Sequence, residues 1–241
     1  MSRLFLPVSP SRMTATTTTT PYGFKPEALS SHSRMLACFP ASGRGGRVLD
    51  VGGGEGYLAT ILVTRGFEVV CVAAPGTVSP EMPATVSVIE ADLDYERPHV
   101  GRSFDYVVCG DVLEHLRTPV LTLDWIAQSL APSGQLIASL PNGMHAYVRL
   151  RALLGHFPED ERGLFDRTHL HFYSWKAWSA LFARAGFRID RMWPTPVPIG
   201  LLVERWRGRA PVRALEALSY GAAAIWTSLL AYQFVVVARR R

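Results

Sequence analysis

Several residue types that mark particular classes of protein are scarce in this chain. Lys25 and Lys176 are the only lysines, so nearly all of the positive charge is arginine. The three cysteines, Cys38, Cys71 and Cys109, are too far apart for a zinc site, and their odd number argues against a disulfide framework. We therefore expect buried or free thiols in a reducing compartment. No carboxylate and histidine ligands share a recognisable spacing, so the sequence predicts no metal site.

The N-terminus lacks the features of a targeting signal. MSRLFLPVSP has one arginine and a short apolar patch, but Pro7 and Pro10 interrupt it and no adequate hydrophobic region follows. The run of threonines from Thr16 to Thr20 is of low complexity, and residues 1–21 are expected to be a disordered leader. The default expectation is a cytoplasmic protein.

The positive charge collects late in the chain without any recognisable nucleic-acid-binding module. The net charge is +5, and a solvated face is its simplest interpretation, with an anionic lipid surface or an acidic substrate as alternatives. We expect no nucleic-acid partner. The stretch VERWRGRAPVRALEAL could lie on a membrane with its arginines reaching toward headgroups, which predicts peripheral membrane contact through residues 200–230.

The last apolar run, which starts at Gly221, approaches the length of a membrane span and ends in three arginines. Thr227, Ser228 and Gln233 interrupt it, and its second half has the pattern of a strand. We therefore predict a helix followed by a closing strand, with a membrane anchor as the alternative.

The chain has the size and the alternating pattern of one α/β domain. Its 241 residues, 48% of them hydrophobic, suffice for a full core. Short β-branched runs alternate with helical patterns, which is typical of a parallel sheet covered on both faces. The predicted strands are Val48–Val51, Glu68–Ala73, Val86–Glu90, Phe104–Gly110, Gln135–Leu140, FRIDRMW from Phe187 and Tyr232–Ala238.

The stretch VLDVGGGEGYL ends a strand on a carboxylate and then places four glycines in five positions. Bare backbone at the start of a helix lets a nucleotide or nucleoside approach closely. Gly54, Gly56 and Ala59 satisfy the dinucleotide pattern G-x-G-x-x-A, but that match is weak alone. Asp50 would oppose a pyrophosphate and favour a ligand with positive charge, such as the sulfonium and ammonium of S-adenosylmethionine.

These residues and several later stretches resemble class I S-adenosylmethionine-dependent methyltransferases. The first motif is Asp50 with Gly52, Gly54 and Gly56 in D-x-G-x-G-x-G. The others are EADL, FDYVVCGDVLEHL, LIASLPN, DRTHLHFYS and ARAGF, and the resemblance covers roughly residues 22–193. The nearest branch is that of ubiquinone-biosynthesis O-methyltransferases and MetW-like proteins.

The resemblance implies a Rossmann-like doubly wound seven-stranded sheet in three αβα layers, with the antiparallel last strand between the fifth and sixth. Residues 22–241 would form the methyltransferase domain, with a helical insert at about 194–230. The cofactor S-adenosyl-L-methionine would be bound by the motif residues and by the ends of the third and fourth strands. The implied cofactor-binding residues are Asp50, Gly52, Gly54, Gly56, Asp92, Leu93, Cys109 and Asp111.

One departure from the family pattern concerns the ribose. The family usually ends its second strand on an acid that binds both ribose hydroxyls, and Ala73 stands there. A charge-assisted hydrogen bond contributes roughly 1.5 to 3 kcal/mol, so its loss would weaken binding about tenfold to a hundredfold. Ser79 or Glu81 could restore the contact. The departure favours an alternative, a catalytically degenerate methyltransferase-fold binding or partner module; an NAD-dependent dehydrogenase is the less favoured alternative.

A hydroxyl acceptor needs a base, and histidine is suited to that role near neutral pH. His171 and then His169, in DRTHLHFYS, are the candidate catalytic residues, since related O-methyltransferases carry a histidine before their late helix. We expect O-methylation of a small-molecule or lipid-like acceptor.

Overall fold

The computed structural model describes residue 25 and residues 27–101, 103–156, 160–161 and 163–241. The predicted leader, residues 1–21, lies outside the described residues. The strands are β1 (Arg47–Val51), β2 (Glu68–Ala73), β3 (Ser87–Glu90), β4 (Phe104–Gly110), β5 (Leu130–Pro141), β6 (Phe187–Pro194) and β7 (Gln233–Arg240). The helices are α1 (Ser31–Ala37), α2 (Tyr57–Thr64), α3 (Pro119–Ser129), α4 (Ala146–Leu153), α5 (Trp175–Arg184), α6 (Ile199–Leu202), α7 (Ala210–Ile225) and α8 (Thr227–Leu230), with 3-10 turns η1 (Leu113–His115) and η2 (Glu204–Trp206).

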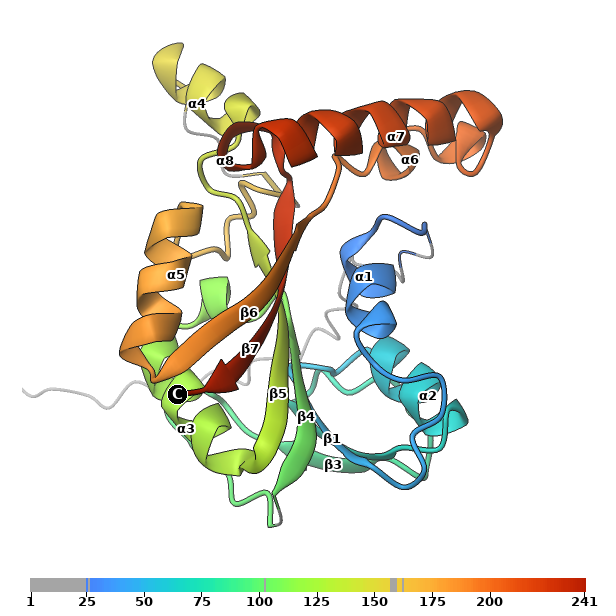
Figure 1. Cartoon of the computed structure of the whole chain (residues 1–241), viewed down its shortest axis with the longest axis vertical. Helices are drawn as coiled ribbons and strands as arrows, with labels where there is room; N and C mark the ends of the chain where they lie inside the picture. Colours follow the sequence, from blue (N-terminus) through green and yellow to red (C-terminus); the bar gives the residue numbers. More distant parts are fainter. Residues whose placement is uncertain (1–24, 26, 102, 157–159, 162) are drawn as a thin grey trace, which may run out of the picture.

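One seven-stranded sheet organises the fold, and its order is β3-β2-β1-β4-β5-β7-β6 (Figure 1). β1 to β5 pair in parallel, whereas β7 is antiparallel to both β5 and β6. The predicted Rossmann-like topology, with the last strand inserted between the fifth and sixth, is confirmed. The order in which successive strands are added to the sheet reverses between β1 and β4. Ligands of such sheets bind at this switch point.

Helices cover the sheet on two faces because successive strand residues point to opposite sides. On one face α1 and α2 bury Met35 and Leu62 against residues such as Val48. On the other, α3 and α5 pack against residues such as Leu49 with a cluster that includes Trp178. The α5 stripe of Trp178, Leu181 and Phe182 is core packing, as its helical spacing predicts.

Residues that favour helix starts precede both α5 and α3, but only one of them makes a side-chain capping bond. Ser174 caps α5, and its side chain accepts a hydrogen bond from the Ala177 amide. Thr118 precedes α3, but its side chain makes no capping bond, and Pro119 alone marks that start. The fifth strand begins earlier than predicted, at Leu130, because Leu130 already pairs with Phe104 before a register shift.

Two connections, one between β2 and β3 and one between β6 and β7, differ from the simple alternation of strand and helix. No helix forms between β2 and β3 within the described residues, as the prolines there predict. The segment between β6 and β7 holds α6, η2, α7 and α8. The run from Gly221 holds the end of α7, the short helix α8 and the closing strand β7, as predicted. Among the residues described, no helix is long and apolar enough to cross a membrane.

Candidate functional site

The loop between β1 and α2 needs glycine for both conformation and space. Gly52 has φ +80°, and a Cβ there would lie 2.3 Å from Cγ2 of Val112. A Cβ on Gly53 would lie 2.2 Å from Oδ2 of Asp50. The strand therefore ends on a carboxylate that rests directly against bare backbone.

Asp50 is almost completely buried, although its side chain is a carboxylate. The residue is 2% exposed, and its Oδ2 atom finds no hydrogen-bond partner among the described residues. Burial raises the pKa of Asp50 to about 7. A buried carboxylate without a partner favours a ligand that brings a positive charge or hydrogen-bond donors to it. The site therefore fits a cationic ligand better than an anionic one.

A cavity of about 450 Å³ opens beside this loop at the carboxyl ends of β1 and β4. That volume is in the range of small-molecule sites. The glycine loop forms one wall, and the opposite wall comes from η1 and from the segment 161–169, with the start of β7 between them. Its lining includes Lys25, Asp50, Gly52, Gly56, Gly110, Asp111, Glu114, His115, His169, Tyr232 and Gln233.

Asp111 lies at the end of β4 with φ +54°, a conformation that aspartate tolerates. Its Oδ1 atom accepts hydrogen bonds from Ser139 Oγ and, at 2.8 Å, from Gln233 Nε2. Lys25 Nζ lies 3.9 Å from the other oxygen. Although burial by itself raises the pKa of Asp111, Lys25 and these hydrogen bonds hold it below its ordinary value. The carboxylate is therefore ionised and fixed in direction.

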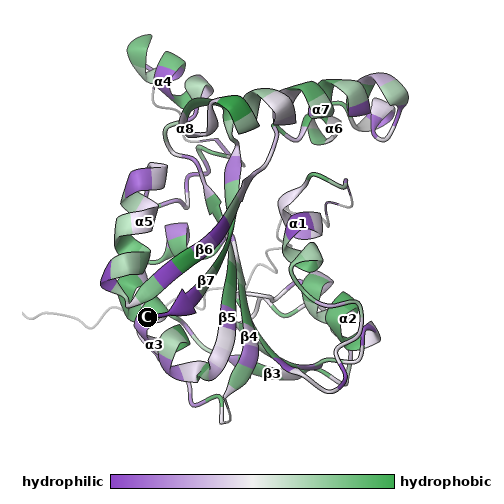
Figure 2. Ribbon diagram, viewed as in Figure 1, coloured by the Kyte–Doolittle hydropathy of each residue, from purple (hydrophilic) through white to green (hydrophobic). Residues whose placement is uncertain are grey.

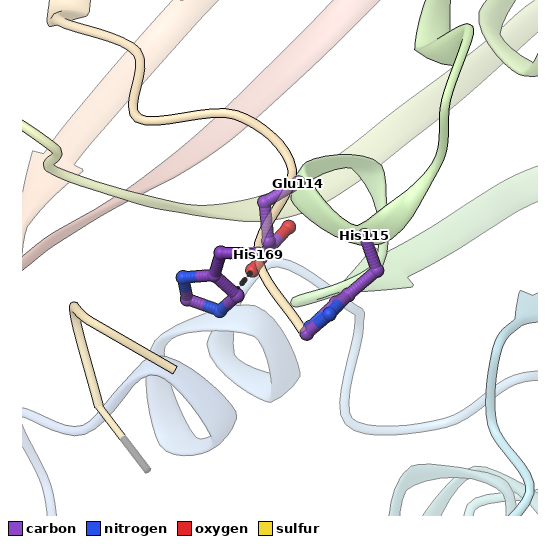
Figure 3. A group of neighbouring side chains, drawn as sticks. All are labelled: Glu114, His115 and His169. Atoms are coloured by element: carbon purple, nitrogen blue, oxygen red, sulfur yellow. Dashed lines mark ion pairs between the residues drawn. The ribbon is translucent and has the colours of Figure 1, made fainter. Parts of the chain in front are cut away.

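Glu114 stands on the opposite wall, and sequence reasoning missed it. The residue is 1% exposed, and neither carboxylate oxygen has a hydrogen-bond partner among the described residues. Burial, with the nearby charge of Asp111, raises the pKa of Glu114 well above its ordinary value. Figure 3 shows His169 pointing at this carboxylate, with His169 Nε2 4.0 Å from Oε1.

His115 joins Glu114 and His169 in one group. The rings of His115 and His169 meet edge to face with centroids 4.7 Å apart, and ligand atoms of all three residues lie within 4.8 Å of one another (Figure 3). One carboxylate and two imidazoles are a donor set suited to a divalent transition metal. The group could hold such an ion, and it could not be recognised from sequence spacing because His169 lies on a distant segment.

The segment that carries the two candidate histidines is attached to η1 by its backbone. The amides of Leu170 and His171 donate to the carbonyl of Glu114 at 2.8 and 3.2 Å. The His169 side chain is 7% exposed and lines the cavity, and burial followed by the charge of His115 lowers its pKa. His171 lies outside the cavity lining, where its Nε2 is 2.9 Å from the Leu116 carbonyl.

The structure does not bring every predicted cofactor residue to the cavity. Asp92 is exposed, and its Oδ1 accepts the Asp94 amide at 2.9 Å. Leu93 is buried, and Cys109 is wholly buried in the core while Gly110 beside it lines the cavity. Gly54 is also buried outside the lining.

Ala73 closes β2 and is 1% exposed. Its register partner on β3 is Glu90, whose Oε2 accepts the Gly76 amide at 2.8 Å. The loop after β2 folds onto the glycine loop, since the Ser79 amide donates to the Gly54 carbonyl at 2.8 Å. Neither Ala73 nor Glu90 is part of the described cavity lining.

Comparisons with known proteins identify the family of this chain. A methyltransferase domain family matches residues 26–191. The ubiquinone biosynthesis O-methyltransferase of Xanthomonas campestris pv. campestris (strain B100) is 31% identical over 192 residues, covering 75% of this chain and 76% of the relative. The protein of the same name from Xylella fastidiosa (strain M23) is 29% identical over 194 residues, covering 75% and 74%.

Solved structures share the fold at low sequence identity. An S-adenosylmethionine-dependent methyltransferase from Mesorhizobium loti has a TM-score of 0.57 and 16% identity, covering 88% of this chain and 98% of the other. An O-methyltransferase from neocarzinostatin biosynthesis, in complex with S-adenosylmethionine and a hydroxylated naphthoic acid, has a TM-score of 0.50 and 17% identity, covering 86% and 52%. With the family match over most of its length, the chain belongs to the methyltransferase domain family and is an S-adenosylmethionine-dependent methyltransferase.

Proposed function

We propose that this methyltransferase methylates an oxygen atom of a small-molecule or lipid-like acceptor. The observation that carries the proposal is one cavity with two unlike walls. Asp50, whose buried Oδ2 has no hydrogen-bond partner among the described residues, lies beside the glycine loop, and the pair of Glu114 and His169 lines another part of the cavity. The part with Asp50 suits a cationic cofactor. The part with Glu114 and His169 suits an acceptor hydroxyl, which loses its proton in the reaction.

The cofactor residues have separate proposed roles. Asp50 and the glycines would hold the charged amino-acid end of S-adenosylmethionine, and Asp111 would border the reacting methyl group beside Cys109. Asp92 and Leu93, at the end of β3, would receive the adenine. When bound, the cofactor supplies an electrophilic methyl group on a sulfonium.

His169 is the proposed proton acceptor. Its lowered pKa keeps the imidazole neutral near pH 7, so that a ring nitrogen can accept a proton. His169 would take up the hydroxyl proton of the acceptor when the acceptor oxygen receives the methyl group. His171 would act as a positioning residue, because its contact with the Leu116 carbonyl fixes the direction of this segment.

Two features support oxygen and a lipid-like acceptor. The relatives are named ubiquinone biosynthesis O-methyltransferases, and α8, which packs on the apolar helix α7, leads into Tyr232 and Gln233 of the cavity lining. We propose a cytoplasmic protein with peripheral membrane contact through residues 200–230.

Calorimetric titration with S-adenosylmethionine and, in parallel, NAD tests the cofactor. We expect micromolar binding of the first and no heat with the second. Binding of NAD alone would establish the dehydrogenase alternative, and no heat with either would establish the degenerate binding module that Ala73 favours.

Incubation with phenols that carry or lack an alkyl tail, followed by mass spectrometry, tests the acceptor. A product heavier by one methyl group on oxygen supports the proposal, and methylation only on nitrogen or carbon contradicts it.

A further inference from the structure

Helix α7 turns several of its large apolar side chains away from the protein. Leu215, Leu218 and Ile225 share one face of the helix by their spacing, and they are 51%, 71% and 90% exposed. The opposite, inward face holds Glu216, which is buried and accepts the Gly200 amide at 2.9 Å. This arrangement reverses that of an ordinary surface helix, which buries its leucines and exposes its acids.

The exposed apolar surface continues beyond α7. Trp226, which follows the helix, is 59% exposed. We call Leu215, Leu218, Ile225 and Trp226 the outer face of α7. Figure 2 shows hydrophobic colour along α7 and on α4, both at the end of the molecule beyond the carboxyl ends of the parallel strands. On α4, Leu153 is 84% exposed. Contiguous exposed apolar patches of this kind mark interaction surfaces.

Arginines without acidic partners accompany the outer face. Arg205, Arg209 and Arg213 are exposed and form no ion pair with any residue that the structure describes. Between residues 199 and 231 the only acids are Glu204 and Glu216, and Glu216 faces inward. The surroundings of the outer face are therefore positive, which complements anionic headgroups.

The outer face is also connected to the cavity. Helix α8 packs on α7 and leads directly into Tyr232 and Gln233, which line the cavity. A bilayer lying against α7 would thus be linked through α8 to the lining of the acceptor site, which supports the transfer of a lipid-like acceptor between them.

We propose that the outer face of α7 docks on the surface of an anionic lipid bilayer, with its apolar side chains among the acyl chains and the arginines at the headgroups. This inference rests on the proposed function, since it names the source from which the acceptor is taken. It differs from a transmembrane anchor, because no described helix is able to span a bilayer.

Flotation of the full-length protein with vesicles tests the proposal without cofactor or acceptor. One set of vesicles is phosphatidylcholine alone, and the other is an equimolar mixture with phosphatidylglycerol. We expect binding to the mixed vesicles, weakened at high salt, and little binding to the neutral ones. The Leu215→Glu variant should bind the mixed vesicles about tenfold more weakly.

Leu121 on α3 supplies a matched control, because it is also 51% exposed and lies away from α7. Leu121→Glu should bind vesicles like the wild type, and thermal unfolding checks that both variants are folded. Equal loss in both variants, or no binding of the wild type to anionic vesicles, overturns the proposal.

A concentration-dependent dimer that Leu215→Glu abolishes, measured by light scattering, would also overturn it, because the occupant would then be a second copy of the chain. Methyl transfer to a soluble phenol is measured separately. Activity there without vesicle binding refutes only the docking, and vesicle binding without activity refutes only the proposed function.

Discussion

Replacing Asp50 by asparagine should stabilise the protein without cofactor and weaken cofactor binding at the same time. The asparagine keeps the shape of the side chain but removes a charge that is buried with one oxygen unpaired. Most substitutions in a buried site destabilise, so an increase in stability would be a specific signature of the buried charge.

The magnitude follows from the pKa. Burial moves the pKa of Asp50 from 3.8 to about 7, which corresponds to ~4 kcal/mol of folding free energy once the group is fully ionised. The native state binds the proton more tightly than the unfolded state, so stability falls as the pH rises from about 4 through about 7. Below that interval the carboxyl is protonated in both states and the variant gains nothing from this effect.

Thermal unfolding at pH values on both sides of this interval is the assay. We expect Asp50→Asn to raise Tm by up to about 10 °C above pH 8, and by much less near pH 4. Asp124→Asn, a half-buried carboxylate on α3 outside the cavity, is the control and should show no such difference.

Calorimetry supplies the second readout. Loss of the charge should weaken S-adenosylmethionine binding about tenfold to a hundredfold. A variant that is less stable at high pH, or that binds the cofactor as tightly as the wild type, would refute the assignment of Asp50 to a cationic ligand.

Substitutions at His169, Glu114 and Gly53, with His171 and Gly221 for comparison, test other parts of the site. His169→Gln should lower kcat about a hundredfold or more and remove the acidic limb of the pH–rate profile, whereas His171→Gln should lower kcat less and keep that limb. Glu114→Gln should raise stability at neutral pH in thermal unfolding, because burial raises the pKa of this carboxyl; if a bound metal ion holds the carboxylate, the variant loses stability and a chelator destabilises only the wild type. Gly53→Ala should abolish cofactor binding in calorimetry, since its Cβ would lie 2.2 Å from a carboxylate oxygen, while Gly221→Ala, with open space around it, should be neutral.

The sheet and the glycine loop could be predicted because their signals are local. A strand such as Glu68–Ala73 reads as a continuous β-branched run because both of its faces are covered. The approach of Asp50 to the loop follows from three adjacent glycines. Both signals need only neighbouring residues, and the order of the strands then follows from the family resemblance.

The opposite wall of the cavity could not be predicted, because its residues meet only in the folded chain. Glu114 and His169 come together through backbone bonds between η1 and the segment before α5. Lys25 reaches Asp111 from the other end of the sequence. Helical periodicity likewise reveals an apolar stripe on α7, but it does not reveal that this stripe faces outward.

The two halves of the cofactor site differ in how closely they follow the family pattern, and one sequence feature explains why. The connection from β2 to β3 carries three prolines in place of a helix, and it contacts the glycine loop through Ser79. Ala73 is buried in the position of the missing acid, and Glu90 of the next strand is already bonded to the Gly76 amide. The part of the site that would hold the amino-acid end of the cofactor therefore follows the family pattern more closely than the part that would hold the ribose and adenine. Cofactor affinity should accordingly depend more on Asp50 than on any carboxylate at the ends of β2 and β3, and for this reason the Asp50 substitution is the most direct test of the site.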